Sequence, residues 1–314
     1  MEQPQTLQQA IKYFSDPEVC FEYAKNLNWP NGVECPYCRN KELSFISTQQ
    51  VWNCRPCGKR FSVRVGTIFE SSRLPLETWF AAMWLIANAK NGISSCEIAR
   101  SLGVTQKTAW FLLHRIRYIM ETGSIAKMEG TVEVDETVIG AKAKTMHADK
   151  RQEKREQGFP KSIVFGLKER GGNVQTMIIG DASKETLHGI INYVVEEGST
   201  VCTDSWKSYQ GLSERYEHGI VDHKKGQYTS GDNGEYSTNG MENYWSILDR
   251  CYHGTYVQLS GWHLHRYLAE EDFRYNSRTE KDGDRFRRVA SQIVGKRLTY
   301  DQLTTGHLQH IAPK

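Results

Sequence analysis

The sequence predicts a multidomain protein with a small cysteine-rich β domain, an all-α domain and an α/β domain built on a mixed sheet. Three observations predict this class: two Cys-x-x-Cys pairs lie near the N-terminus, apolar residues recur at helical spacing in residues 75–90, and strand-like runs alternate with helices after residue 130. We place an N-terminal helical segment at 1–30, the cysteine-rich domain at 31–70, the all-α domain at 71–125, the α/β domain at 130–280 and a C-terminal tail at 281–314.

The composition is that of a folded protein with little net charge. Of 314 residues, 39% are hydrophobic and 11% aromatic, enough to bury a core in each of two or three domains. The net charge is +3, with 15 Lys and Arg against 11 Asp and Glu in residues 1–130 and 25 against 26 after them. This mild excess permits nucleic-acid binding by the first part. No stretch approaches the ~18 apolar residues of a membrane span, so we expect a cytoplasmic protein without a membrane partner.

The first predicted domain is a zinc ribbon. Cys35 and Cys38 form one Cys-x-x-Cys pair, and Cys54 and Cys57 form the other after fifteen intervening residues. This spacing suits four thiolates around one tetrahedral Zn²⁺. The intervening segment alternates like a hairpin, and residues 58–63 continue as a third strand. Four thiolates close the coordination sphere, so the zinc would be structural and not catalytic. The alternative is a pair of disulfides in a secreted protein, for which the sequence shows no signal peptide.

A helix-turn-helix is predicted in the second domain. Ser94 or Ser95 caps a short helix, Gly103 ends it, and Thr105 caps a longer helix. An ordinary helical hairpin has the same pattern, but the neighbouring zinc ribbon favours DNA binding. The residues expected to meet base edges at the exposed start of the second helix are Gln106, Lys107 and Thr108, and those expected to reach phosphates are Arg115 and Arg117.

Strands alternate with helices in the third domain. Three strands, a helix and a fourth strand is the order of a ribonuclease H-like domain, in which the first and fourth strands run side by side. We expect strands at 131–139, 162–169, 173–180, 199–203 and near 219–222, and helices at 184–197, 206–216, 240–252 and 261–276.

Three acidic residues stand where that fold would bring them together. Asp135 lies in the first strand, Asp204 follows the fourth, and Glu242 opens a helix. Carboxylates that converge from separate elements suit two Mg²⁺ (or Mn²⁺) ions about 3.5–4 Å apart, which can promote in-line attack at phosphorus. Asp135 would bridge the ions, while Asp204 and Glu242 would complete one site each. Each acid alone could instead be a turn residue or a helix cap. Alternatives for the third ligand are Asp181, Asp222, Asp232 and Glu235.

Two further groups of residues could contact DNA. Residues 142–161 are rich in Lys and Arg, so they either track DNA or form a solvated loop. Aromatic residues could stack on unpaired bases, but at helical spacing they are more often core. We expect at least three of the following four to be buried: Trp206, Tyr209, Trp245 and Trp262.

The chain resembles insertion-sequence DDE transposases of the group related to the eukaryotic Merlin elements. Besides the cysteine pairs, the matching runs are 132–137, 203–209, 239–246, 254–256, 263–268 and 274–278. The resemblance implies an enzyme, associated with the nucleoid of a bacterial cell, that binds the terminal inverted repeats of its element in double-stranded DNA. It would cleave there with Mg²⁺ and join the freed 3′ ends to target DNA. Two ends must be brought together, so we expect a homodimer or a higher homo-oligomer.

One position departs from the pattern of that family. Relatives usually carry a basic residue seven positions after the catalytic Glu, whereas this chain has Asp249 there and Arg250 next. A cation at this place could hold a phosphate or the DNA strand, and Arg250 is the candidate. The alternative is a catalytically impaired DNA-binding protein derived from a transposase.

Overall fold

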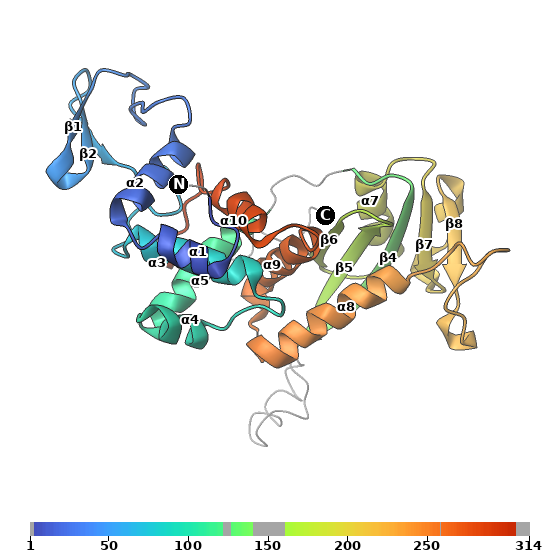
Figure 1. Ribbon diagram of the computed structural model, residues 1–314. Coiled ribbons are helices and arrows are strands. Elements are labelled where there is room, and N and C mark those ends of the chain that lie inside the picture. Colours follow the sequence, from blue (N-terminus) through green and yellow to red (C-terminus); the bar gives the residue numbers. More distant parts are fainter. Residues whose placement is uncertain (1–2, 122–126, 141–160, 258, 306–314) are drawn as a thin grey trace. The chain divides into compact units, whose positions relative to one another are not determined.

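The computed structural model describes residues 3–121, 127–140, 161–257 and 259–305 (Figure 1). These residues form two compact units. The first unit holds the residues up to 121 together with those from 279 onward, and the second holds the residues between 127 and 278. None of the described helices has the length and the mean hydropathy that a membrane crossing requires.

The first unit begins with two helices and a three-stranded antiparallel sheet. Trp52 of the middle strand stacks on Phe21 of the second helix, with ring centroids 5.6 Å apart, and on Phe61 of the third strand at 5.8 Å. The predicted hairpin and its third strand are confirmed. In chain order the elements are α1 (Leu7–Tyr13), α2 (Pro17–Asn28), β1 (Leu43–Ile46), the 3-10 helix η1 (Ser47–Gln49), β2 (Val51–Cys54) and β3 (Arg60–Ser62).

Three helices follow, and their ends agree with the predicted caps. The side chain of Ser94 accepts a hydrogen bond from the backbone of Glu97, and that of Thr105 accepts one from the backbone of Thr108. Between them, Gly103 has a left-handed φ of 65°, a conformation that favours glycine. The short helix, the turn and the longer helix are therefore present. The elements are α3 (Leu76–Asn88), α4 (Ser95–Leu102) and α5 (Gln106–Met120).

The residues after 278 differ from the predicted tail, because they fold onto the first unit. Phe286 is buried, and its ring lies 5.3 Å from that of Trp84 in α3. Lys296 donates hydrogen bonds to the carbonyl oxygens of Tyr118 and Glu121, at 3.2 and 2.9 Å, and so satisfies the end of α5. The few apolar residues of this segment lie among many charged ones, which hides its helices in the sequence. The helices of this segment are α10 (Asp282–Ala290) and α11 (Tyr300–Thr305).

The second unit is built on a five-stranded mixed sheet. Its first three strands are antiparallel neighbours, and its fourth strand pairs in parallel with the first, as predicted. The fifth strand pairs in parallel with the fourth. The sheet order is β6-β5-β4-β7-β8, with β4 (Thr131–Gly140), β5 (Lys161–Glu169), β6 (Val174–Ile179), β7 (Thr200–Asp204) and β8 (Glu217–Val221).

Three helices cover the two faces of this sheet: α7 (Lys184–Val194), α8 (Asn239–Cys251) and α9 (Leu264–Asn276). Val132 and Val134 of β4 pack in a core with residues of α7. Val164 of β5 packs instead in a core with Met241 and Tyr244 of α8. Side chains alternate between the faces of a strand, so the odd-numbered residues of β4 face α8. Figure 1 shows α7 and α8 on opposite faces of the sheet.

The predicted helix at 206–216 is wrong, because two short 3-10 turns take its place. Gly211 between these turns has a φ of 97°, a left-handed value that ends any helix there. The short elements of this unit are η3 (Lys207–Tyr209), η4 (Leu212–Glu214), η5 (His223–Lys225), the π-helical turn η6 (Tyr252–Tyr256) after α8, and η7 (Gly261–His263) before α9. Residues 142–160 of the predicted basic segment lie outside the described residues.

Candidate active site and zinc site

Asp135 and Asp204 occupy neighbouring positions on two parallel strands. The pairing of β4 with β7 sets Thr131 beside Thr200 and Glu133 beside Cys202. Continued by two residues, the same register sets Asp135 beside Asp204. Burial, together with the negative charges of Glu136 and Asp204, raises the pKa of Asp135 to about 7. The strand ends therefore concentrate negative charge at one point of the sheet.

Protein donors orient both carboxylates. Oδ1 of Asp135 accepts the backbone N–H of Glu136 at 2.9 Å, and its Oδ2 accepts a hydrogen bond from Trp245 of α8. Oδ1 of Asp204 accepts the backbone N–H of Trp206, also at 2.9 Å. Each carboxylate thus has a fixed direction that local backbone geometry and α8 impose.

Glu242 lies in the first turn of α8, where its side chain is 43% exposed. Its Oε1 is 3.2 Å from Nε2 of His223, which comes from η5 after β8. The same nitrogen lies 3.0 Å from the hydroxyl of Thr238. Because a carboxylate only accepts hydrogen bonds, this contact requires the tautomer with a proton on Nε2. Nothing in the sequence pattern marks His223, since its contact depends on how η5 and α8 meet.

The three acids do not share one tight cluster. Within the described residues, they do not form a set of three whose ligand atoms all lie within 4.8 Å of one another. Mg²⁺ ions would not require such a cluster, because each usually keeps several waters and takes one or two carboxylates.

Other acids near the three have partners of their own. Glu133 accepts a hydrogen bond from the backbone of α8, and Glu136, on the opposite face of β4, accepts one from Tyr209. The side chains of three of the four alternative third ligands have partners in hydrogen bonds or an ion pair with nearby residues: Asp181, Asp222 and Glu235.

The four cysteines of the ribbon form a second site. Their ligand atoms all lie within 4.8 Å of one another, with 3.7 Å between the sulfurs of Cys35 and Cys57 and 3.5 Å between those of Cys38 and Cys54. A tetrahedral Zn²⁺ with bonds of about 2.3 Å sets its sulfur ligands about 3.8 Å apart. Burial acts to raise the pKa of Cys35, but backbone N–H groups, including that of Tyr37, lower it to about 7. The donor set therefore fits a structural zinc ion.

Comparison with protein families assigns both parts of the chain. Residues 127–276 match the model of an ISXO2-like transposase domain, and residues 15–60 match that of a transposase zinc-ribbon domain. The chain therefore contains an ISXO2-like transposase domain. The first matched range contains all three acids and the second contains all four cysteines, so the resemblance to insertion-sequence transposases is confirmed.

The chain is also similar to a protein of Halobacterium salinarum described as an uncharacterized protein in transposable element ISH50. The two are 27% identical over 238 residues, which cover 71% of this chain and 79% of the other. Membership of a transposase family implies that DNA is the partner of the protein.

The start of α5 exposes two of the residues predicted to meet base edges. Gln106 and Lys107 are exposed, and Thr108 is half-buried beside Thr105. Nε2 of Gln106 donates to the hydroxyl of Ser95 in α4 at 2.9 Å. The first helix of the pair therefore orients a side chain at the start of the second.

The predicted phosphate contacts of Arg115 and Arg117 are wrong in this structure. Arg115 is 3% exposed and Arg117 is 1% exposed. The guanidinium of Arg115 donates to the carbonyl oxygens of Ile68 and Glu70, and it lies 4.9 Å from the ring of Trp79. Both arginines belong to the interior of the first unit, because all residues from 112 to 117 are buried and this part of α5 is covered on every side.

Arg250, the candidate for a phosphate contact, is exposed. Its Nη1 donates to the hydroxyl of Ser246, one turn back toward Glu242, at 3.3 Å. Asp249 lies 3.1 Å from Nε2 of His253. An acid–histidine pair therefore lies at the position where the resemblance led us to expect a cation.

The expectation that three of the four selected aromatic residues are core is wrong. Tyr209 is buried and Trp245 is half-buried, whereas Trp206 and Trp262 are 53% and 63% exposed. Trp206 lies outside any helix because the predicted helix at 206–216 is absent.

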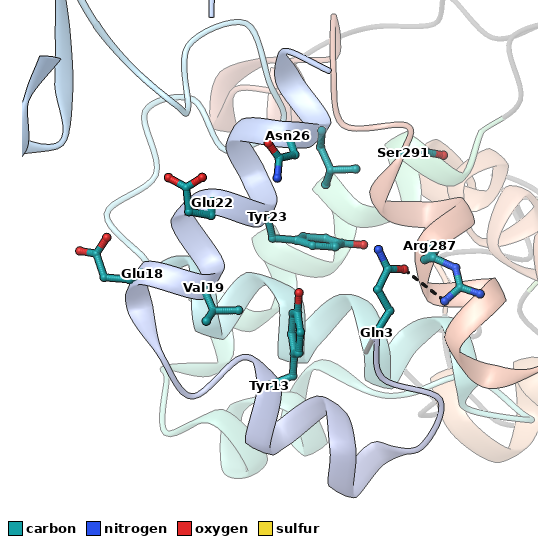
Figure 2. Close-up of a pocket in the computed structure, with 10 residues that line it drawn as sticks. Gln3, Tyr13, Glu18, Val19, Glu22, Tyr23, Asn26, Arg287 and Ser291 are labelled. Carbon is teal, nitrogen blue, oxygen red and sulfur yellow. Dashed lines mark hydrogen bonds between the residues drawn. The ribbon is translucent and has the colours of Figure 1, made fainter. Parts of the chain in front are cut away.

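A cavity of about 610 Å³ lies in the first unit, and none of its lining residues belongs to either site. Figure 2 shows the hydroxyls of Tyr13 and Tyr23 directed into it, with Gln3 and Arg287 joined by a hydrogen bond of 3.2 Å on one wall. The carboxylates of Glu18 and Glu22 stand on the other side. These acids make it a poor site for a DNA phosphate.

Proposed function

We propose that this transposase binds the terminal inverted repeats of its insertion sequence, cleaves the 3′ ends with Mg²⁺ or Mn²⁺, and joins them to target DNA by two-metal in-line phosphoryl transfer. The observation that carries this proposal is the parallel pairing of β4 with β7, which sets Asp135 beside Asp204. The strand order and the helices on both faces agree with a ribonuclease H-like domain.

The donor set fits hard divalent cations. Asp135, Asp204 and Glu242 offer only oxygen ligands, which Mg²⁺ prefers. The pKa of Asp135 is raised partly by the charge of Asp204, and a bound cation offsets repulsion of this kind. When bound, the two ions would activate the attacking oxygen and stabilise the departing 3′ oxygen.

The protein itself supplies orientation. In-line displacement depends on groups held within a fraction of an ångström of their working positions. Trp245 holds Asp135, the backbone of Trp206 holds Asp204, and His223 holds one oxygen of Glu242. The second oxygen of Glu242 would then face the metal site.

The first unit would read the DNA. We assign α4 and α5 to a helix-turn-helix, with Gln106 and Lys107 at base edges and Thr108 behind them. Arg250 would contact a phosphate of the cleaved strand, as its exposure and its reach toward Glu242 suggest. Since two ends must be joined in one reaction, the working form would be a homodimer or a higher homo-oligomer.

Nicking and strand transfer on DNA that carries the ends of the element test this proposal. We expect the wild type to cut in Mg²⁺ or Mn²⁺, and Asp135→Asn and Glu242→Gln to bind the ends normally without cutting. Glu196→Gln, which removes an exposed acid of the same unit that is not a candidate ligand, is the matched control and should cut like the wild type. A wild type that binds the ends but never cuts with either metal would instead be a transposase-derived DNA-binding protein, the alternative that Asp249 favours.

A further inference from the structure

Glu133 is a buried acid that the proposed reaction does not use. It lies two residues before Asp135 on the same face of β4 and is 4% exposed. A buried carboxylate requires hydrogen bonds or opposite charges to offset its lost hydration. Its Oε1 lies 3.5 Å from the guanidinium of Arg170, and its neighbour across the sheet is Lys168 of β5.

The other oxygen of Glu133 caps the start of α8. Oε2 accepts the backbone N–H of Met241 at 3.0 Å. This N–H is one of the first four of a helix, which have no partner within it. Thr238, the residue at the N-cap position, makes no capping hydrogen bond with its side chain. The hydroxyl of Ser237 accepts the N–H of Asn239, whereas the cap of Met241 comes from β4, 108 residues away in the chain.

Gly240 leaves room for this cap. A Cβ atom at this position would lie 2.5 Å from Oε2 of Glu133 and 2.7 Å from Nζ of Lys168. Such distances are too short for real contacts, so any other residue would push the carboxylate and the ammonium away from the helix. The glycine, the acid and the lysine thus form one arrangement at the start of α8.

Two contacts fix α8 along β4. Glu133 bonds to the backbone of Met241, and Asp135 bonds to the side chain of Trp245. Two residues of a strand span about 6.6 Å, and four residues of a helix span about 6 Å. The two contacts therefore match in spacing, and they set both the position of α8 along the strand and its rotation.

We propose that Glu133 is a positioning residue of the metal site. It fixes the start of α8 on β4 and thereby sets the place of Glu242, which follows Met241, relative to Asp135. Glu133 acts through the helix and does not bind a metal ion itself. This inference rests on the proposed function, because it concerns the same two carboxylates.

The test compares four variants of the full chain. Glu133→Ala removes the carboxylate that caps Met241, and Gly240→Ala displaces this carboxylate from the helix without removing it from the chain. Glu133→Gln keeps an oxygen that can accept the N–H of Met241. Glu129→Ala, at an exposed acid four residues earlier, is the matched control. The readouts are amide hydrogen exchange of residues 239–243 without metal, Mn²⁺ binding by electron paramagnetic resonance, and cleavage of the element ends.

We expect faster exchange at the start of α8 and roughly 10- to 100-fold weaker Mn²⁺ binding in Glu133→Ala and Gly240→Ala, the range found for groups that orient metal ligands. Glu133→Gln should stay close to the wild type in hydrogen exchange and in Mn²⁺ binding. The control Glu129→Ala should equal the wild type in both.

Two results would overturn the inference. One is faster exchange in Glu133→Ala with unchanged Mn²⁺ affinity, which would make the cap purely structural. The other is equal loss of Mn²⁺ binding in Glu133→Gln and Glu133→Ala with normal exchange in both, which would make Glu133 a metal ligand. Failure of the proposed function looks different, because the wild type itself would then bind no Mn²⁺ at the three acids.

Discussion

The indole Nε1 of Trp245 donates a hydrogen bond of 2.9 Å to Oδ2 of Asp135. The helix that carries Glu242 thus also orients the carboxylate of the neighbouring strand. Gly166, the partner of Asp135 across the sheet, makes this possible, since a Cβ there would lie 2.8 Å from the ring of Trp245. The orientation of Asp135 and the position of Glu242 therefore both depend on α8, and Trp245 links them.

Replacing Trp245 with Phe should weaken metal binding and slow cleavage by about 10-fold or more, the usual effect of removing a group that orients a ligand. The phenyl ring still covers Gly166, so folding and DNA binding should be nearly unchanged. A Mn²⁺ titration of cleavage at the element ends measures the effect. Trp262→Phe is the control, because Trp262 is an exposed tryptophan of the same unit. Equal metal dependence in the wild type and Trp245→Phe would show that the hydrogen bond is dispensable.

His223 should matter for the third acid. His223→Ala removes the donor to Oε1 of Glu242, so the carboxylate gains freedom and should bind metal more weakly, again by about 10-fold. His223→Gln can still donate from its amide and should recover part of the loss. Single-turnover cleavage at a series of Mg²⁺ concentrations separates a shift in metal affinity from a loss of rate at saturation. A defect in DNA binding alone would contradict this role.

The sequence was sufficient to predict that the first and fourth strands of the second unit lie side by side. Asp135 and Asp204 are 69 residues apart, and an equal offset relates Thr131 to Thr200 in the observed register. The capping residues around Gly103 were predictable for a similar reason, since helix ends depend on local hydrogen bonds.

The missed features depend on contacts between distant segments. Glu133 has a role only because α8 begins above it, and His223 only because η5 reaches Glu242. Arg115 shows the same limit, since helical spacing gives its angle around α5 but does not reveal that residues 68–70 cover that side. Tertiary packing determines the contacts of these residues, and no short pattern in a single sequence reveals that packing.

Asp249→Lys should tighten DNA binding. The pair of Asp249 with His253 is largely exposed, so its loss should cost little stability. A new cation on the face of α8 that carries Glu242 should add about one phosphate contact and steepen the salt dependence of binding by about one unit in the log–log slope. Arg250→Ala should reduce that slope by a similar amount. Fluorescence anisotropy over a salt series measures both. Unchanged slopes in both variants would place the DNA away from this end of α8.

The second unit should lose stability as the pH rises from about 4 to 7. Burial raises the pKa of Asp272 to about 7, although hydrogen bonds from Tyr244 and Thr176 oppose this. In that pH range the folded protein keeps a proton that the unfolded chain releases, so the free energy of unfolding falls. The effect is on the order of 4 kcal/mol at most, because one pKa unit corresponds to about 1.4 kcal/mol.

Asp272→Asn isolates this group, because its amide is neutral at every pH and can still bond to Tyr244 and Thr176. The difference in melting temperature between the wild type and the variant should therefore shift in favour of the variant as the pH rises. Thermal melts at intervals between pH 4 and 8 measure it. A difference that stays constant with pH would mean that Asp272 titrates alike in the folded and unfolded chain.

Removal of zinc should unfold the ribbon. Its three strands hold only four, four and three residues, too few to be stable without further support. Metal binding is therefore a large part of the folding free energy of this domain.

Cys54→Ser or a chelator should release about one zinc ion per chain, separate Trp52 from Phe21 and change the tryptophan fluorescence. Cys96→Ser, at an exposed cysteine outside the cluster, should retain the metal. Because the ribbon packs on α2 through the stack of Trp52 on Phe21, binding of the DNA ends should weaken together with the change in fluorescence. If the zinc-free protein still binds the DNA ends fully, the ribbon is not part of the DNA interface.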